Sequence, residues 1–209
     1  MKIAIIGAGC QGLVVSDIID EMKKSDKSIC VIGFIDDGEM NIGKKVGNYK
    51  IIGRIKDLSK LKADRVIVAI GDNKTRNEIV RKIKTRYFTA IHPSAVISKS
   101  AQILEGSMVL GGVVVNAGAR IGKHVILNTG CTVDHHNVIN DFVHVAPGVH
   151  LGGNVKIGNG VLVGIGATVI NNITIGKWTV IGAGSVVVKN IKGNIVTFGT
   201  PAKYIRDNR

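Results

Sequence analysis

The chain has 209 residues, of which 45% are hydrophobic, 4% aromatic and 27 glycine, and its formal net charge is +13. The glycines do not follow a G-X-Y period, which excludes collagen. The three cysteines include no C-x-x-C pair, which argues against a disulfide framework. No apolar run is long enough for membrane insertion. The positive charge is spread over both halves without interleaved aromatics, so no nucleic-acid partner is expected. Because the start, MKIAIIGAGC, lacks the layout of a signal peptide, we expect a cytoplasmic protein.

The first 90 residues alternate between apolar runs and segments with helical spacing. Strands are predicted at residues 2–6, 30–35 and 65–70, and helices at residues 13–24, 55–61 and 73–86. Such alternation is typical of a parallel sheet covered by helices. We therefore expect a small Rossmann-like α/β domain over residues 1–90.

Downstream of this domain, an aliphatic side chain recurs at every sixth position without exception. The series is Ile97, Ile103, Val109, Val115, Ile121, Leu127, Val133, Ile139, Val145, Leu151, Ile157, Val163, Val169, Ile175, Ile181 and Val187. A second lane of mostly small residues lies four positions after each of these, and it includes Cys131 and one amide, Asn137. A period of six is typical of a hexapeptide-repeat parallel β-helix, in which three hexads form one triangular coil.

We therefore expect an all-β left-handed β-helix over residues 91–191, with about five coils. At about 4.8 Å per coil it would be roughly 25 Å tall. A β-helix exposes strand edges at its ends, so residues 192–209 are expected to form a C-terminal cap or tail.

A glycine-rich turn joins the first predicted strand to the first predicted helix. GAGCQG at residues 7–12 has the spacing G-x-G-x-x-G, which can present backbone N–H groups and a helix dipole to an anion. Asp36 and Asp37 end the second strand, where a carboxylate can bind a sugar hydroxyl, and Gly71 follows a later strand. Because 90 residues hold only half of a dinucleotide fold, a nucleotide-linked ligand is favoured over NAD. A glycine turn needed for packing alone is the alternative.

Histidines are densest at residues 132–137, TVDHHN. Because Val133 points inward, His135 is expected near a corner of the prism, where it could face a neighbouring subunit. A neutral imidazole there can act as a general base near neutral pH. Asp134 or Asp141 could orient its ring.

Two other interpretations of these histidines remain open. His135, His144 and His150 could form a metal site across an interface, although their spacing differs from that of hexapeptide-fold carbonic anhydrases. Alternatively the histidines, above all His124 and His150, are surface residues without a function.

Seven segments of the sequence resemble a known family. They are GAGCQGLVV (7–15), GFIDD (33–37), AIGDN (69–73), IHPSA (91–95), VILNTGCTVDHHNVINDFVHVAPGVHLGG (125–153), VIGAGSVVVKNI (180–191) and GTPAK (199–203). The family is that of hexapeptide-repeat acetyltransferases of the sialic-acid O-acetyltransferase and UDP-4-amino-sugar (bacillosamine-type) N-acetyltransferase kind. The resemblance covers nearly the whole chain, and the segment 125–153 is its most specific part.

This resemblance implies a homotrimer with active sites between neighbouring prisms, acetyl-CoA as co-substrate and no metal. It implies that His135 is the general base and that Asn128 shapes the site. His144 and the backbone near Ile165 and Ala183 would contact acetyl-CoA. The residues implied to bind a uridine nucleotide-sugar are Gly9, Cys10, Gln11, Asp36, Asp37 and Gly71.

The chain departs from the family pattern at two places. Cys10 and Gln11 stand where members have glycine and histidine or a close variant, which affects substrate identity. His136 follows His135, at the position where members have an acidic residue that strengthens the base. Three explanations remain open: Asp134 strengthens His135 instead, the base is weaker, or the acceptor differs.

The resemblance implies an acetyl-CoA-dependent N-acetyltransferase of bacterial glycan biosynthesis. Its acceptor would be the amino group of a 4-amino-4,6-dideoxy or 2,4,6-trideoxy sugar linked to a nucleotide, UDP above others. The alternatives are an O-acetyltransferase acting on sialic acid and, in another class, a non-catalytic trimeric scaffold.

Overall fold

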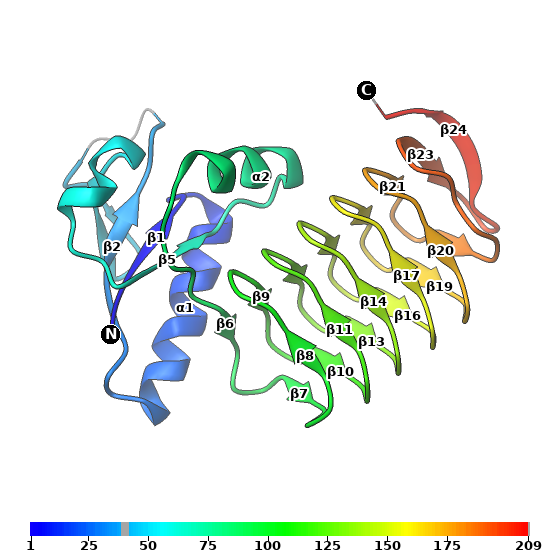
Figure 1. The fold of residues 1–209 in the computed structure, drawn as a ribbon, viewed down its shortest axis with the longest axis horizontal. Helices are drawn as coiled ribbons and strands as arrows, with labels where there is room; N and C mark the ends of the chain where they lie inside the picture. The colour runs from blue at the N-terminus through cyan, green and yellow to red at the C-terminus, as the bar shows by residue number, and fades with distance from the viewer. Residues whose placement is uncertain (39–41, 209) are drawn as a thin grey trace. The chain divides into compact units, whose positions relative to one another are not determined.

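The computed structural model describes residues 1–38 and 42–208 and divides into two compact units, Met1–Pro93 and Ser94–Arg209 (Figure 1). The division falls at Pro93, a few residues beyond the boundary expected at residue 90. Within the described residues, no helix is both long enough and apolar enough to cross a membrane.

The N-terminal unit contains a five-stranded sheet. Its order is β3 (Lys45–Val46), β4 (Tyr49–Gly53), β2 (Cys30–Ile35), β1 (Lys2–Ile6) and β5 (Arg65–Val68). The pairings β4–β2, β2–β1 and β1–β5 are parallel, whereas β3 and β4 form an antiparallel hairpin. The parallel sheet expected from the sequence is confirmed. Neither strand of this hairpin was predicted, and the two residues of β3 are too few to show a periodicity.

Helices cover this sheet because alternate residues of each strand point to opposite faces. Ala4 and Ile6 of β1 pack in one apolar cluster with Ile79 of α2 (Asn73–Lys82) and Ile55 of the 3₁₀ helix η1 (Ile55–Lys60). Helix α1 (Cys10–Ser25) packs against β1 and β2 through its own buried residues. Helix α2 is shorter than the predicted 73–86, because the backbone at Ile83 is extended.

The C-terminal unit is a parallel solenoid whose sixteen two-residue strands each end at one of the predicted aliphatic residues. The first face holds β7 (Val96–Ile97), β10 (Val114–Val115), β13 (Thr132–Val133), β16 (His150–Leu151), β19 (Thr168–Val169) and β22 (Val186–Val187). The second holds β8 (Gln102–Ile103), β11 (Arg120–Ile121), β14 (Val138–Ile139), β17 (Lys156–Ile157) and β20 (Thr174–Ile175). The third holds β9 (Met108–Val109), β12 (Ile126–Leu127), β15 (His144–Val145), β18 (Leu162–Val163) and β21 (Val180–Ile181).

The turns that follow the strands of each face form the first, second and third edges of the prism. At every sixth residue from Gly106 to Gly184, a turn residue has a positive φ. Those that are not glycine are His124, His136, Phe142, Asn154, Asn172 and Trp178. A left-handed residue at each corner lets the chain change direction between two-residue strands.

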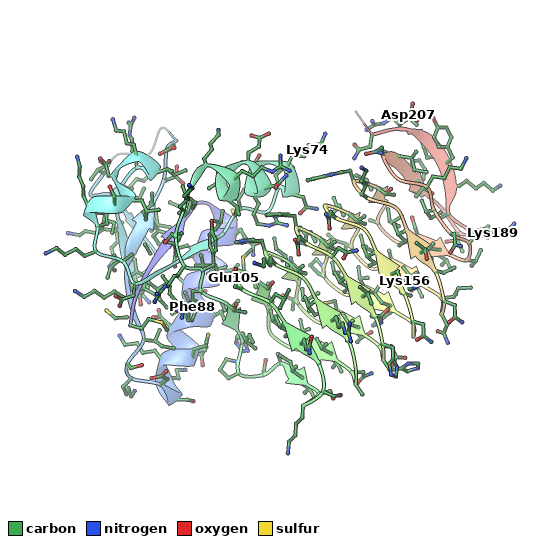
Figure 2. All side chains as sticks on the ribbon, viewed as in Figure 1. Lys74, Phe88, Glu105, Lys156, Lys189 and Asp207 are labelled. Carbon is green, nitrogen blue, oxygen red and sulfur yellow. The ribbon has the colours of Figure 1, made fainter. Side chains whose placement is uncertain are left out.

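The interior of the prism contains the aliphatic series and the lane of small residues, as predicted. From Val115 to Val187 every member of the aliphatic series is buried, and the polar lane residues Ser107, Asn137, Thr179 and Ser185 are inaccessible to solvent. Outward positions carry exposed residues such as Lys156 on β17 (Figure 2).

After the last coil, the chain ends in a hairpin that extends the third face. Strand β23 (Ile195–Phe198) pairs in parallel with β21, and β24 (Lys203–Asp207) pairs antiparallel with β23 (Figure 1). Strand β6 (Ala90–Ile91) lies at the end of the N-terminal unit.

Candidate active site

His135 lies in a tight turn on the first edge of the prism, directly after β13, and its side chain is exposed. Asp134 Oδ1 accepts a hydrogen bond from the backbone N–H of His135 at 2.7 Å and another from Asn116 Nδ2 at 3.0 Å. These two hydrogen bonds lower the pKa of Asp134. The carboxylate of Asp134 therefore binds the backbone of the turn.

The ring of His135 contacts two other groups. Its Nδ1 lies 3.1 Å from Nδ1 of His136, with the ring planes at 76°. Its Cε1–Nε2 edge lies over Gly153 of the next coil, where an added Cβ would stand 2.5 Å from Cε1 and 2.6 Å from Nε2. His136 occupies the left-handed corner position, with φ of 57°, and its N–H donates to the Ala117 carbonyl at 2.9 Å.

Asn137, the amide of the small lane, lies inside the prism immediately after this turn. Its Nδ2 donates to the carbonyl of Asp134 at 2.7 Å and to that of Gly152 at 3.0 Å. Its Oδ1 accepts the N–H of Val155 at 2.7 Å. The amide thus ties the turn that carries His135 to the coil that supports its ring.

Asn128 and His144 form a second polar pair. Asn128 lies on the third edge, His144 is on β15 of the third face, and Asn128 Nδ2 is 3.1 Å from His144 Nε2. Asn128 Oδ1 accepts the N–H of Thr129 at 2.8 Å, which fixes the orientation of the amide.

Ile165 and Ala183 occupy the same turn position on the third edge, and both are exposed. The N–H of Gly184 donates to the carbonyl of Ile165 at 2.8 Å. The left-handed corner residues of this edge are all glycine: Gly112, Gly130, Gly148, Gly166 and Gly184. A Cβ added at any of the last four would meet no atom within 4 Å, so this strip of backbone is open to a ligand.

The predicted site residues therefore fall on two different edges of one prism. His135 and His136 are on the first edge, whereas Asn128, Ile165 and Ala183 are on the third. The structure does not bring the two sets together within one chain.

Other residues that the sequence suggested as partners of His135 lie on other parts of the prism. Asp141 lies on the second edge, where its Oδ1 accepts the N–H of Lys123 at 2.8 Å, so it does not orient His135. His150 is on the first face, with Nδ1 2.9 Å from Thr132 Oγ1, and His144 is on the third. In the described ranges, no three His, Cys, Asp or Glu side chains are grouped as metal ligands. His124 is buried and stacks on Phe142, so it is no surface residue.

In the N-terminal unit, a cleft of about 280 Å³ lies at the carboxyl ends of β1 and β2. It is lined by Ile6, Gly7, Ile35, Asp36, Asp37, Gly38, Ile55, Ile70, Ile79 and Lys82. This is the edge at which open α/β sheets bind ligands.

Of the predicted substrate residues, Asp36 and Asp37 line this cleft. Asp36 accepts the N–H groups of Ala8 at 2.6 Å and Gly38 at 2.8 Å, and Asp37 Oδ1 accepts that of Ile55 at 2.8 Å. These carboxylates line the cleft and at the same time order its loops.

The glycine turn combines close packing with an accessible helix terminus. A Cβ at Gly12 would overlap the Gly7 carbonyl oxygen, so Gly12 is required for packing. Gly9 precedes α1, Cys10 and Gln11 begin it, and a Cβ added at Gly9 would meet no atom within 4 Å. Space is likewise open at Gly71.

Sequence reasoning missed two residues of this region. Lys82, in the last turn of α2, lines the cleft. Arg76 is inaccessible to solvent, and its guanidinium donates to the carbonyls of Ile70 at 2.7 Å and Gly71 at 3.2 Å. Burial lowers the pKa of Arg76 to about 9, which leaves it charged at neutral pH. Arg76 thus fixes the loop that precedes α2.

Two family models match the chain: the PglD N-terminal domain over residues 2–83 and the bacterial transferase hexapeptide (six repeats) over residues 154–189. UDP-N-acetylbacillosamine N-acetyltransferase of Bacillus subtilis is 36% identical over 114 residues, which are 52% of this chain. The aligned part spans 51% of that curated relative.

Two solved structures resemble the chain over almost its full length. One is a histidine-to-asparagine variant of perosamine N-acetyltransferase from Caulobacter crescentus in complex with CoA and GDP-perosamine. It has 33% identity and a TM-score of 0.91, with coverage of 99% of this chain and 98% of that one. The other is the acetyltransferase domain of PglB from Neisseria gonorrhoeae in complex with acetyl coenzyme A, with 33% identity, a TM-score of 0.89 and 98% coverage of both chains.

These likenesses confirm the fold class and the family that the sequence motifs indicated. The match to perosamine N-acetyltransferase spans both units and 98% of that chain at 33% identity. The chain therefore belongs to the acetyl-CoA-dependent, hexapeptide-repeat sugar N-acetyltransferases that join a PglD N-terminal domain to a left-handed β-helix.

Proposed function

We propose that this protein transfers the acetyl group of acetyl-CoA to the amino group of a nucleotide-linked 4-amino-4,6-dideoxy or 2,4,6-trideoxy sugar, with His135 as the general base. One observation carries the proposal. His135 is exposed on a fixed turn, in a chain whose fold matches over almost its whole length a perosamine N-acetyltransferase solved with CoA and GDP-perosamine.

The chemistry requires one proton acceptor and accurate positioning. The sugar nitrogen attacks the thioester carbonyl, a C–N bond forms, and the C–S bond breaks to release CoA. His135 Nε2 takes the proton from the nitrogen and passes it to the departing sulfur, a contribution of roughly 10²–10⁴-fold. Holding both substrates side by side makes the reaction effectively unimolecular.

The acetyl-CoA site is proposed on the third edge. The open glycine strip beside Ile165 and Ala183 admits a thin ligand against the backbone, and the Asn128–His144 pair supplies polar groups at one end of it. Exposed Ile165 offers an apolar contact, with 60% of its surface accessible.

A homotrimer is proposed because one chain holds only half of this site. His135 is on the first edge and the proposed acetyl-CoA strip is on the third, so two copies must meet to bring base and thioester together. Packing three prisms side by side would create three equivalent sites.

The nucleotide is proposed to bind in the cleft of the N-terminal unit. The start of α1 offers backbone N–H groups to phosphate, and Asp36 and Asp37 offer carboxylates to hydroxyls. Lys82 adds a cation for the diphosphate. UDP is the nucleotide that the family resemblance implies, and perosamine N-acetyltransferase was solved with GDP-perosamine, so both nucleotides are tested.

The deciding experiment is an assay of CoA release and product mass with acetyl-CoA and a panel of UDP-, dTDP- and GDP-linked 4-amino sugars. We expect one N-acetylated product from the wild type and a loss of at least 100-fold in turnover for His135→Ala, with acetyl-CoA affinity retained. Wild-type turnover in that variant would remove His135 as the base. Acetylation of free sialic acid would favour an O-acetyltransferase, and absence of acetyl-CoA binding would favour a scaffold.

The subunit interface has its own test. His135→Ala and His144→Ala chains, each impaired alone, are unfolded together, refolded and assayed. Mixed trimers would contain some sites with both histidines intact and regain activity, whereas sites confined to one chain would gain nothing from mixing. Sedimentation should give three times the chain mass.

A further inference from the structure

We propose that His136 is a positioning residue that accepts a hydrogen bond from Nδ1–H of His135 and so keeps Nε2 of His135 free to take the substrate proton. The inference rests on the proposed function of His135. It concerns the residue that directly follows His135 in the same turn.

The geometry supplies the contact. The two Nδ1 atoms are 3.1 Å apart, within hydrogen-bonding distance, and the rings meet edge to face at 76°. A hydrogen bond between two such nitrogens needs a proton on one and a lone pair on the other. The contact therefore couples the tautomer of one ring to that of the other.

Only one of the two possible arrangements supports catalysis. If His136 donated, Nδ1 of His135 would be the acceptor, and its proton would be on Nε2, where it blocks general-base action. If His135 donates, its Nε2 has a free lone pair that can accept the substrate proton. When His135 then takes the substrate proton, its Nδ1–H faces a neutral acceptor, which stabilises the imidazolium through a charge-assisted hydrogen bond.

In the structure the neighbouring carboxylate of Asp134 is bound to other groups. Asp134 Oδ1 accepts the backbone N–H of His135 and the side chain of Asn116. Asp134 shapes the turn and adds negative charge near the imidazolium, and the ring contact is made by His136.

The fold also holds His136 in place. Its backbone is left-handed, its N–H donates to Ala117, and its ring lies against Gly118 of the preceding coil, where a Cβ would be 3.0 Å from Cδ2. At the same corner of the next coils stand Asn154 and Asn172, with φ of 60° and 63°. His136 is thus a bulky residue at a corner that suits glycine and asparagine, and its ring contact with His135 gives a reason for its presence.

The test uses His136→Gly, which removes the ring at a backbone conformation that glycine adopts freely. We expect kcat to fall about 10- to 100-fold, a part of what a general base contributes, while the KM for acetyl-CoA changes less than twofold. Asn172→Gly makes the same backbone change at the same corner, two coils from His136, and should keep full turnover. His136→Asn fits the corner and retains an acceptor oxygen, so it should recover part of the loss.

Nitrogen NMR of protein labelled with ¹⁵N in histidine gives a readout that a merely structural role would not change. In the wild type the Nδ1 of His135 should be protonated and Nε2 not, and in His136→Gly the proton should shift toward Nε2. His135→Ala identifies the signals. An Nε2–H form in the wild type, or full kcat in His136→Gly, would overturn the proposal. If His135→Ala itself keeps turnover, the proposed function fails instead.

Discussion

The imidazole of His135 rests on the backbone of Gly153, so closely that a Cβ at position 153 would stand 2.5 Å from Cε1. Gly153 does not have a positive φ, so alanine can adopt its backbone without strain. Gly153→Ala should therefore push the ring out of place while leaving the solenoid folded. We expect kcat to fall at least 10-fold, because a displacement of about 1 Å can cost 10²-fold in rate.

The control for Gly153→Ala is the binding of acetyl-CoA, measured by calorimetry, together with the unfolding temperature. Both should stay close to those of the wild type, since the third edge is untouched. Undiminished turnover would show that the ring can occupy another position and still act.

Asn137 should support both stability and turnover. In Asn137→Ala the carbonyls of Asp134 and Gly152 and the N–H of Val155 lose their side-chain partner. Leaving buried polar groups unpaired costs about 1–3 kcal/mol each, so we expect a loss of at least about 2 kcal/mol in unfolding free energy. Because the turn that carries His135 is also released, kcat should fall at temperatures where the variant is folded.

Val155→Ala is the matched control for Asn137→Ala. It removes apolar volume from the same lane one coil farther on but keeps the backbone N–H that Asn137 binds. Denaturant unfolding should show destabilisation of about 1–3 kcal/mol, with kcat retained. Equal losses of kcat in both variants would mean that stability alone explains the effect of Asn137.

Asn128 and His144 should act as one unit toward acetyl-CoA. Their hydrogen bond of 3.1 Å means that removing either leaves the other without this partner. In a double-mutant cycle of Asn128→Ala and His144→Ala, the affinity losses should fall short of additivity by about 0.5–1.5 kcal/mol. The pair Thr132–His150, on the first face, should show no effect on acetyl-CoA affinity. Additive losses would argue against a joint role.

The fold could be predicted from the sequence because each hexad combines a strand and a corner, and one inward aliphatic residue marks each strand. The same period places His135 at a corner and Ile165 and Ala183 at equivalent positions of another edge. The contacts of the site could not be predicted in this way. Asn137 reaches Gly152 and Val155, and His135 reaches Gly153, only because residues about one coil apart stack.

Charged residues were the least predictable. Arg76 has the sequence pattern of a solvated helix residue, yet its guanidinium is buried and binds the carbonyls of Ile70 and Gly71. Its sequence position makes Asp134 a candidate partner for the His135 ring, but its Oδ1 accepts the backbone N–H of His135 at 2.7 Å. Local hydrogen bonding of this kind is common for aspartate in turns, and sequence spacing does not reveal which donor wins.

Cys131 should make stability fall at alkaline pH. Burial raises the pKa of its thiol to about 12, from a reference value of 9.0. Above pH 9 the unfolded chain loses this proton while the folded chain keeps it, so unfolding becomes more favourable as pH rises. Between pH 8 and pH 10 the expected loss is about 1.4 kcal/mol.

Cys131→Ala should remove this component of the pH dependence, whatever it does to stability at pH 7. The measurement is urea unfolding at pH 8 and pH 10 for both proteins. Cys10 and Cys30 are exposed and common to both, so their contribution cancels. Identical pH dependences would show that the thiol is no source of the alkaline loss.

Lys82 should strengthen nucleotide binding through charge. It lines the cleft at the carboxyl ends of β1 and β2, where the diphosphate is proposed to lie. For Lys82→Met we expect the Kd of the preferred nucleotide diphosphate to rise about 5-fold at low salt, corresponding to about 1 kcal/mol for an exposed charge pair. The difference should shrink as ionic strength rises, because salt screens exposed charges.

The control is Lys156→Met, on the solenoid strand β17 (Figure 2), which makes the same change in net charge and should leave the Kd unchanged. If both variants weaken binding equally, the net charge of the protein rather than a contact from Lys82 attracts the nucleotide.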